Sequence, residues 1–442
     1  MPAAPFTARP TGAAQAGWGP FSSLRHPQAP GAWTESILHS FAGSPDGMHP
    51  FAGLVFGVGG NAGSLFGTTV MGGTGAGSGG IVFELSPSSA GGSAWSEAVL
   101  WDFSGGGKAG RHGVGYPEGT LLVEPDGALF GTAHGSCFND HDFPSTVFKM
   151  TGPASPGGAW TLHNIFNLGA IVGGGDGAEG ICPPAGVVSQ GGSLYGTTYQ
   201  GAAGGEDNFC GEYPGLGCGA AYALSPPAAA GGVWTGTPLH AFTGPPDGAF
   251  PEAPLTVGPN GVLYGTTATG GTGACLGEGF PYAEGGCGTV FQLTPPAASG
   301  GAWTETVLYS FTATNGDSAY PAAGVVLGAN GVLYGTTQYG GSFTAGSPCQ
   351  VAVSSVFGCG TVFQLTPPAS PGGAWTETVL YSFSGKNGEG SMPLAGVTFG
   401  PGNVLYGTTS ARRDGWGGHR FLAGAQLRHP GCEFAHALDS KR

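Results

Sequence analysis

Apolar and polar positions along the chain form four short runs that repeat, and each run predicts a β-strand. In the clearest copy the runs cover residues 323–327, 332–337, 361–365 and 375–383. β-Branched and aromatic residues fill these runs, and Gly, Pro and Asn separate them. The sequence has no sustained 3.6-residue apolar period with helix caps. We therefore expect an all-β chain and name the four strands a, b, c and d in chain order.

The four-strand unit recurs at a fixed spacing. Strand b carries the motif Leu-Tyr/Phe-Gly-Thr-Thr/Ala, whose central glycines are 64 to 72 residues apart: Gly67, Gly131, Gly196, Gly265, Gly335 and Gly407. Six tryptophans keep step with them: Trp33, Trp95, Trp160, Trp234, Trp303 and Trp375. Four short antiparallel strands per repeat are typical of a propeller blade, whereas the coils of a β-solenoid are shorter. The sequence predicts a six-bladed β-propeller over residues 21–409.

The two ends of the array predict how the ring closes. Residues 395–399 and 404–409 match strands a and b, while residues 21–24 and 33–41 match strands c and d. We expect the N-terminal strands to join the C-terminal pair in one blade, because this removes exposed sheet edges. Residues 1–20 and 410–442 fall outside the repeat, and we expect both to be disordered. The second is a basic tail, which fits either a natural extension or a shifted reading frame.

Composition restricts the partners. The 92 glycines and 36 prolines would indicate low complexity without a period, but the period assigns them to turns, and 40% hydrophobic residues supply a core. A net charge of −14 with only 9% charged residues argues against a nucleic-acid partner. No run of 18 apolar residues occurs, so we expect no membrane span. We expect a monomer.

The repeat resembles that of a known family. Pro-Ala-Ala-Gly-Val at 321–325, Leu-Tyr-Gly-Thr-Thr at 333–337, Gly-Thr-Val-Phe-Gln-Leu-Thr-Pro at 360–367 and Trp-Thr-Glu-Thr-Val-Leu-Tyr-Ser-Phe at 375–383 carry the resemblance. This pattern is similar to the GloVer tandem repeat of bacterial secreted or surface proteins. The resemblance covers residues 21–409 and implies export and a C-terminal anchoring segment, but no catalytic residues. The sequence departs from the family at both ends, since residues 1–20 show no signal-peptide pattern and residues 411–442 match no anchor.

The cysteines point to an oxidising compartment. Six of the nine fall in pairs within the b–c loops of three successive repeats: Cys210 and Cys218, Cys275 and Cys287, Cys349 and Cys359. We expect three disulfides that give these loops a fixed shape, with free thiols or a metal site as the alternatives. Cys137 and Cys182 are candidates for a further bridge. The predicted location is extracellular, periplasmic or at the cell surface.

The b–c loops differ most between repeats, and variable loops on a rigid scaffold usually carry binding sites. Four of their aromatic residues are candidate anchors for a glycan or a protein: Tyr213, Phe280, Tyr282 and Phe357. The alternative is that these rings pack the loops onto the blades. A polar cluster supplies four more candidates, for ligand, metal or acid–base chemistry, unless it is only a solvated loop: His134, Asp140, His141 and Asp142.

The d–a loops carry acidic residues in most repeats: Asp46, Asp176, Asp247, Asp317 and Glu389. Near a channel mouth they would suit calcium, while the simpler interpretation is that Asp-Gly forms a turn. We expect no cofactor or metal, with calcium as the alternative. The predicted function is a secreted, non-catalytic module that binds a glycan or protein through its b–c and d–a loops. The alternatives are a hydrolase or lyase with its site at the channel mouth, and a purely structural surface repeat.

Overall fold

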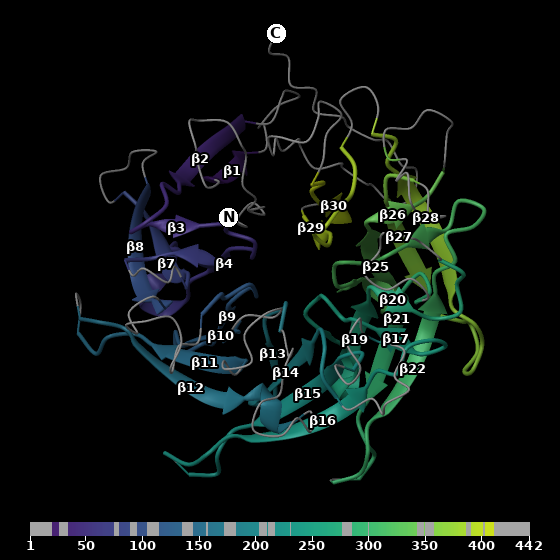
Figure 1. Cartoon of the computed structure of the whole chain (residues 1–442), viewed down its shortest axis with the longest axis horizontal. Helices are drawn as coiled ribbons and strands as arrows, with labels where there is room; N and C mark the ends of the chain where they lie inside the picture. Colours follow the sequence, from purple (N-terminus) through teal and green to yellow (C-terminus); the bar gives the residue numbers. More distant parts are fainter. Residues whose placement is uncertain are drawn as a thin grey trace.

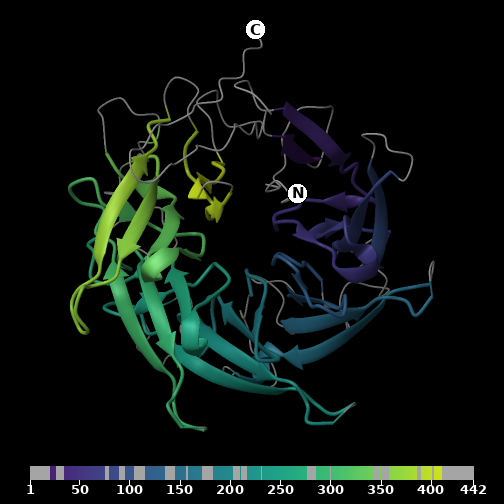
Figure 2. The same ribbon diagram turned by 180° about the vertical axis from the view of Figure 1, so that it is seen from behind.

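The computed structural model describes residues 20–25, 34–74, 79–88, 95–103, 115–134, 145–155, 158–171, 183–202, 210, 217–229, 231–275, 285–298, 300–342, 349, 358–385, 390–400 and 403–410. Within these ranges the regular structure consists of β-strands and short 3-10 turns. Figures 1 and 2 show the sheets arranged in an arc around a central opening. No helix among the described residues is long and apolar enough to cross a membrane.

Five antiparallel four-stranded sheets follow the order predicted for propeller blades, with the strands hydrogen-bonded in sequence order. The first contains β4 (Val55–Phe56), β5 (Leu65–Thr69), β7 (Ile81–Pro87) and β8 (Trp95–Asp102). The second contains β9 (Leu122–Val123), β10 (Leu129–Ala133), β11 (Thr146–Thr151) and β12 (Thr161–Asn167). The third contains β13 (Val188–Gln190), β14 (Ser193–Thr198), β15 (Ala220–Ser225) and β16 (Thr235–Ala241).

The fourth sheet contains β18 (Thr256–Val257), β19 (Leu263–Thr267), β21 (Thr289–Thr294) and β22 (Thr304–Ser310). The fifth contains β24 (Val326–Leu327), β25 (Leu333–Thr337), β27 (Thr361–Thr366) and β28 (Thr376–Ser382). The 3-10 turns are η1 (Gly59–Asn61), η3 (Leu168–Ala170), η4 (Pro259–Gly261) and η5 (Ala329–Gly331). In the fifth sheet strand a is shorter than predicted, while strands b to d lie within one residue of the predicted bounds. In Figure 1 the first strand of each sheet lies nearest the channel and the fourth lies outermost.

Two further strand pairs lie at the ends of this arc of five sheets. β1 (Pro20–Arg25) pairs with β2 (Thr34–Ser40), and β29 (Thr398–Phe399) pairs with β30 (Leu405–Tyr406). Both pairs lie on the same side of the ring in Figures 1 and 2. Leu38 and Phe41 pack on Ile81 and Phe83 of β7, although β2 belongs to a separate sheet. The four-stranded closing blade is not among the sheets formed by the described residues.

Short two-stranded ladders that the sequence did not predict pair the end of the d–a loop with the start of the b–c loop. β3 (Gly47–Met48) pairs with β6 (Met71–Gly72), β17 (Gly248–Ala249) with β20 (Thr269–Gly270), and β23 (Ser318–Ala319) with β26 (Tyr339–Gly340). Two residues per strand are too few to produce an alternating pattern. An acidic residue directly precedes the first strand of each ladder.

The central glycine of the strand-b motif is required by close packing within the sheet. Gly265 of β19 lies opposite Phe291 of β21, and a Cβ atom on Gly265 would stand 2.3 Å from Cζ of Phe291. The same glycine–aromatic pair recurs as Gly67 with Phe83 and Gly335 with Phe363. A side chain at these positions would displace a fully buried ring, which explains the motif.

Neighbouring sheets are joined by one repeated hydrogen bond and one repeated aromatic contact. The first threonine of the strand-b motif donates to a carbonyl that precedes strand a of the next sheet, as Thr266 does to Ala323 at 3.0 Å and Thr197 to Ala253 at 3.1 Å. The tryptophan before strand d contacts the strand-b ring of the preceding sheet, with Tyr195 and Trp303 centroids 5.9 Å apart. The repeated Thr and Trp therefore hold adjacent sheets together.

We expect Thr266→Val to lower the free energy of unfolding by about 1–2 kcal/mol, because the Ala323 carbonyl loses its buried donor. Chemical denaturation of the variant and the parent measures this difference. Thr304→Val, on an exposed strand position, is the matched control and should change stability by less than about 0.5 kcal/mol. Equal effects of the two substitutions would contradict the role assigned to the hydrogen bond.

Candidate functional site

The three predicted disulfides are confirmed. Their Cα–Cα distances are 5.0 Å for Cys210–Cys218, 5.1 Å for Cys275–Cys287 and 5.2 Å for Cys349–Cys359. The second cysteine of each pair is buried and holds the start of strand c against the following blade. The carbonyls of Cys218 and Cys287 accept hydrogen bonds from Phe250 N and Tyr320 N of the next d–a loop. The disulfides thus stabilise the loop face at the blade junctions, and such bonds are typical of extracytoplasmic proteins.

Most of the predicted binding residues lie outside the described residues: Tyr213, Phe280, Tyr282, Phe357, Asp140, His141 and Asp142. The same holds for Cys137 and Cys182. His134 is described and is buried at the end of strand b of the second sheet. Its Nε2 lies 3.4 Å from Glu118 Oε1, and its ring stacks on Tyr116 with centroids 5.8 Å apart. His134 is therefore packed against Glu118 and Tyr116.

The acidic residues of the d–a loops act first as turn residues. Asp247 accepts hydrogen bonds from Thr243 N at 3.0 Å and from Gly248 N at 2.6 Å, and Asp46 accepts from Ala42 N and Gly47 N in the same way. Asp317 accepts from Thr312 N and Ser318 N, both at 2.7 Å. The turn interpretation therefore holds for these three residues, while Asp176 and Glu389 lie outside the described residues.

Each of these aspartates lies beside outermost strands, so the alternative of a carboxylate ring at the channel mouth does not hold for them. Each aspartate belongs to a cluster of three side chains at a blade junction. The second member comes from strand d of the same repeat, and the third is a glutamate from strand d of the next sheet. Cluster 1 is His39, Asp46 and Glu97; cluster 2 is His240, Asp247 and Glu305; cluster 3 is Tyr309, Asp317 and Glu377. The sequence analysis missed the glutamates, although each follows a tryptophan of the repeat by two residues.

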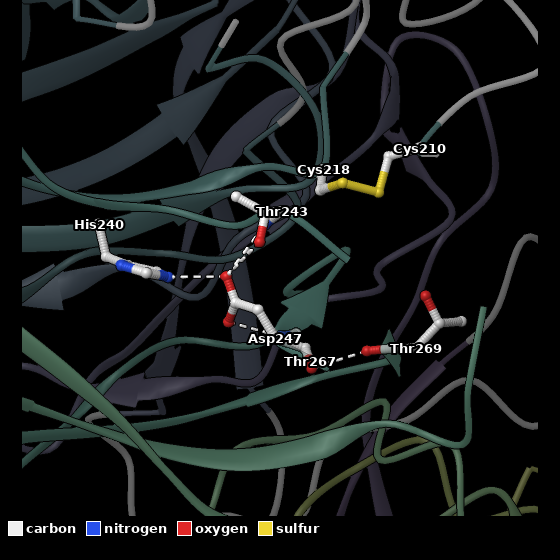
Figure 3. The surroundings of a disulfide bond; sticks show 8 residues. Cys210, Cys218, His240, Thr243, Asp247, Thr267 and Thr269 are labelled. Carbon is white, nitrogen blue, oxygen red and sulfur yellow. Dashed lines mark hydrogen bonds and ion pairs between the residues drawn. A yellow bond between two sulfur atoms is a disulfide. The ribbon is translucent and has the colours of Figure 1, made fainter. Parts of the chain in front are cut away.

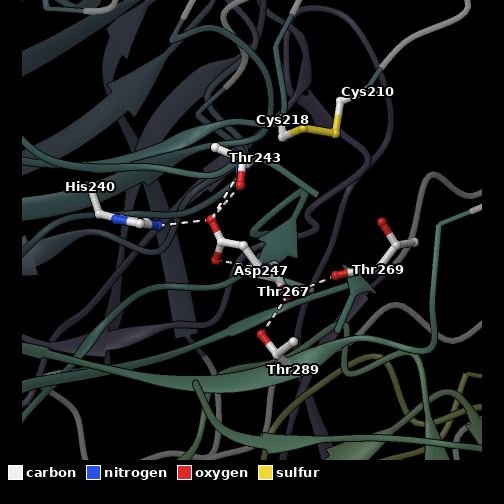
Figure 4. A network of polar contacts seen from close by, with 9 residues as sticks. Cys210, Cys218, His240, Thr243, Asp247, Thr267, Thr269 and Thr289 are labelled. Atoms are coloured by element: carbon white, nitrogen blue, oxygen red, sulfur yellow. Dashed lines mark hydrogen bonds and ion pairs between the residues drawn. A yellow bond between two sulfur atoms is a disulfide. The ribbon is translucent and has the colours of Figure 1, made fainter. Parts of the chain in front are cut away.

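Figures 3 and 4 show cluster 2 from close by. The Asp247 carboxylate lies between the His240 ring and the Thr243 hydroxyl, with Nε2 of His240 3.0 Å from Oδ2 of Asp247. The Cys210–Cys218 disulfide appears in the same views, beyond Thr243. Below Asp247 the buried Thr267 hydroxyl bonds the Thr269 carbonyl at 2.8 Å and the Thr289 hydroxyl at 2.7 Å. These hydroxyls fix the floor of the d–a loop.

The glutamate of every cluster has a strongly perturbed pKa. Burial, followed by the charge of the neighbouring aspartate, raises the pKa of Glu97 and of Glu305 to about 7. Burial and the charge of Asp317 raise the pKa of Glu377 to about 7, although the hydroxyl of Ser318 opposes the shift. Burial works against ionisation of Asp247 as well, but hydrogen bonds from His240 and from its own loop hold its pKa below the ordinary value. Clusters 1 and 2 thus each combine a glutamate of raised pKa with an aspartate of lowered pKa.

Cluster 3 opens into a pocket of about 740 Å³. Strand β28, the end of β22 and the d–a loop of the fourth sheet form its walls, and Ser342 of the b–c loop completes them. The side chains that line it are mainly carboxylates, phenols and other hydroxyls: Tyr309, Thr312, Thr314, Asn315, Asp317, Ser342, Glu377, Tyr381 and Ser382. The d–a loop here is one residue longer from phenylalanine to aspartate (311–317) than at 41–46 or 242–247. Asp317 and Glu377 therefore face a space large enough for a ligand.

No family model matches the chain, and no curated protein matches it. Similar solved structures include an inulosucrase from Halalkalicoccus jeotgali bound to kestose, at 13% identity and a TM-score of 0.36, over 69% of this chain and 77% of that chain. The Trypanosoma rangeli sialidase in complex with the inhibitor DANA is 12% identical with a TM-score of 0.42, over 91% of this chain and 55% of the sialidase. An ulvan lyase of a new polysaccharide lyase family is 11% identical with a TM-score of 0.39, over 88% and 86% of the two chains.

The prediction of a non-catalytic binding module is contradicted by these matches, because the matched proteins are named as enzymes. The physical reason for the error lies in the blade junctions. Sequence reasoning treated each d–a aspartate as an isolated turn residue and gave the strand-d glutamates no role. Packing of adjacent sheets brings Asp317 and Glu377 together in the lining of one pocket.

Proposed function

We propose that this protein hydrolyses a glycosidic bond in the pocket at cluster 3. The observation that carries the proposal is the pair of carboxyl groups in that pocket, Asp317 and Glu377, of which Glu377 has a pKa raised to about 7. Glycoside hydrolysis commonly uses two carboxyl groups with different protonation states, one as the acid and one as the base or nucleophile. The site lies between outermost strands, away from the channel mouth suggested by the sequence.

The roles follow from the surroundings of each group. Glu377 is protonated below about pH 7 and donates its proton to the leaving oxygen of the glycosidic bond. Asp317 accepts hydrogen bonds from Tyr309 Oη at 3.3 Å and from Thr312 N and Ser318 N, which fix its orientation. Asp317 is the base that activates water or the nucleophile that attacks the sugar. Tyr309 and Thr312 are positioning residues for Asp317.

A neutral glycan is the substrate class that the lining favours. Among the described lining residues there is no Lys or Arg to bind a carboxylate or sulfate group, and the chain carries a net charge of −14. Sugar hydroxyls find partners in Thr312, Ser342 and Ser382, and sugar rings stack on tyrosines such as Tyr381. A lyase acting on uronic acids needs a cation to stabilise the substrate carboxylate, so hydrolysis is the better fit.

The test is an assay of the full chain against a panel of neutral and acidic oligosaccharides, with release of reducing ends as the readout. We expect turnover of a neutral glycan, and loss of turnover in Glu377→Gln and in Asp317→Asn. Glu252→Gln is the matched control, because burial raises the pKa of Glu252 to about 7 as well, although it does not line the pocket. Cleavage that persists in both pocket variants would refute the assignment.

We further propose that the ring closes as a sixth blade formed by β29, β30, β1 and β2, and that the protein is exported, as its resemblance to the GloVer repeat implies. The β-bulge between Phe21 and Ser22 matches the one between Val290 and Phe291, so β1 has the register of a strand c. In the fourth sheet Tyr264 of strand b pairs with Gln292 of strand c. The equivalent residues at the two ends of the chain are Tyr406 of β30 and Ser23 of β1, so the closed blade would place them opposite each other.

Ser23→Cys combined with Tyr406→Cys should then form a disulfide under mild oxidation, because facing Cα atoms in a sheet lie within about 7 Å. Non-reducing mass mapping of the oxidised protein detects the bridge. Ser23→Cys combined with Tyr334→Cys, which lies in the fifth sheet, is the control and should stay unbridged. Failure of the first pair to bridge would contradict this closure.

A further inference from the structure

We propose that clusters 1 and 2 are two equivalent binding sites for a divalent transition-metal cation of the zinc class. In each cluster one imidazole nitrogen and two carboxylate oxygens lie within 4.8 Å of one another. The ligands of cluster 2 come from two different sheets. His240 belongs to β16 of the third sheet and Asp247 to the loop that follows it, whereas Glu305 belongs to β22, the outermost strand of the fourth sheet. A bound cation would join these sheets at the outer side of the ring.

The distances suit such a cation. His39 Nε2 lies 3.3 Å from Asp46 Oδ2, and His240 Nε2 lies 3.0 Å from Asp247 Oδ2. Two ligands on a tetrahedral zinc ion with bonds of about 2.0–2.2 Å are separated by roughly 3.3 Å. The imidazole and the aspartate are therefore already at the required spacing, and only the glutamate has to approach.

One buried oxygen of each glutamate provides a second, independent observation. Oε1 of Glu97 and Oε1 of Glu305 are buried without a hydrogen-bond partner. A buried carboxylate oxygen without a partner is costly, and proteins normally satisfy such an atom with a donor or an ion. In both clusters, therefore, one oxygen of the glutamate is left without a partner.

Cluster 3 shows how the chain satisfies this oxygen when no histidine is present. Tyr309 replaces the histidine, and Ser318 replaces the glycine found at Gly47 and Gly248. The Ser318 hydroxyl donates to Oε1 of Glu377 at 2.8 Å, so this oxygen has the donor that Oε1 of Glu97 and Oε1 of Glu305 lack. In clusters 1 and 2 a histidine accompanies a glutamate oxygen without a partner. In cluster 3 a tyrosine accompanies a glutamate oxygen that has a donor.

The ligand set selects the kind of cation. Calcium and magnesium prefer sites made only of oxygen ligands, whereas an imidazole nitrogen favours zinc and its first-row neighbours. Two carboxylates and one neutral imidazole balance the charge of a divalent ion, and a water completes four ligands. This site differs from the calcium ring considered from the sequence, because it requires the histidine and the glutamate of the next sheet. It is independent of the proposed hydrolysis, which uses cluster 3.

The test measures zinc bound to the full chain after removal of metal with EDTA, followed by dialysis against zinc and elemental analysis. We expect about two zinc ions per chain, one per cluster. Glu97→Gln and Glu305→Gln should each remove about one of them, and the double variant should bind none at these sites. Zinc should raise the melting temperature of the parent protein by several degrees and leave that of the double variant unchanged.

Two variants provide the matched comparison. His240→Tyr gives cluster 2 the aromatic residue of cluster 3 and should also lose one zinc ion, while Glu377→Gln should retain both. Without metal, Glu305→Gln should melt at or above the parent temperature, because it removes a desolvated carboxylate, so loss of zinc cannot be attributed to unfolding. Zinc binding that is absent in the parent, or unchanged in Glu97→Gln and Glu305→Gln, would overturn the proposal.

Discussion

Glu377→Gln is expected to lower kcat for glycoside hydrolysis by about 10²- to 10⁴-fold, with little change in KM. The amide keeps the shape of the side chain and its contact with Ser318 but has no proton to give to the leaving group. Steady-state kinetics on the substrate found in the oligosaccharide panel measures the effect. A substrate with a good leaving group, such as a nitrophenyl glycoside, should recover part of the lost rate because it needs less protonation.

The dependence of kcat on pH is a second test of Glu377 as the general acid. Burial and the charge of Asp317 raise the pKa of Glu377 to about 7, and the acid form is the active one. Activity should therefore be present below about pH 7 and fall as the pH rises through 7. Glu252→Gln should keep this limb of the profile, because Glu252 lies outside the pocket. An alkaline limb that is unchanged in residual Glu377→Gln activity would assign the acid to another group.

The blade is predictable from the sequence because its determinants are local. Gly265 lies opposite Phe291 in neighbouring strands of one sheet, so the motif and the strand-c aromatic recur together in every full repeat. The disulfides are predictable for the same reason, since Cys275 and Cys287 are only 12 residues apart and close one loop. The order of the strands and the disulfides within the loops therefore follow from the spacing of residues in the sequence.

The candidate site is not predictable in this way, because it forms between repeats. Asp317 and Glu377 are 60 residues apart, and their meeting depends on how the fourth and fifth sheets pack. The sequence analysis noted the aspartate as a turn residue, and the structure confirms that interpretation. The sequence does not show where β28, the strand that carries Glu377, lies relative to that turn. The extra residue in the loop at 311–317, which accompanies the pocket, has no meaning until the facing strand is known.

The stability of the metal-free protein is expected to fall between about pH 5 and pH 8. Burial raises the pKa of four glutamates to about 7, well above the value of about 4.3 for an unfolded chain: Glu97, Glu252, Glu305 and Glu377. A group whose pKa is raised by folding binds more protons in the folded state, so its stabilisation is complete below the unfolded pKa and disappears as the pH rises through 7.

The other shifted groups do not reverse this sign. Burial opposes protonation of His39, but the hydrogen bond and charge of Asp46 raise its pKa, so its stabilisation also declines as the pH rises. Folding lowers the pKa of Asp46 and of Asp247, so these two groups stabilise the folded protein when ionised. Their stabilisation is lost only as the pH falls below about 5. The four glutamates and His39 therefore act in the same direction between pH 5 and 8.

Thermal melts in EDTA at pH 5.5 and pH 8 measure the size of the effect. We allow about 1 kcal/mol for each glutamate after solvent screening, so four glutamates give about 4 kcal/mol. For a chain of 442 residues this corresponds to a melting temperature roughly 4–5 °C higher at pH 5.5. Glu252→Gln, whose side chain accepts a hydrogen bond from Tyr320 Oη at 3.1 Å, should reduce this difference by about a quarter. A melting temperature that instead rises from pH 5.5 to pH 8 would mean that these glutamates are ionised in the folded protein, and that the junction clusters are more open to water than their burial indicates.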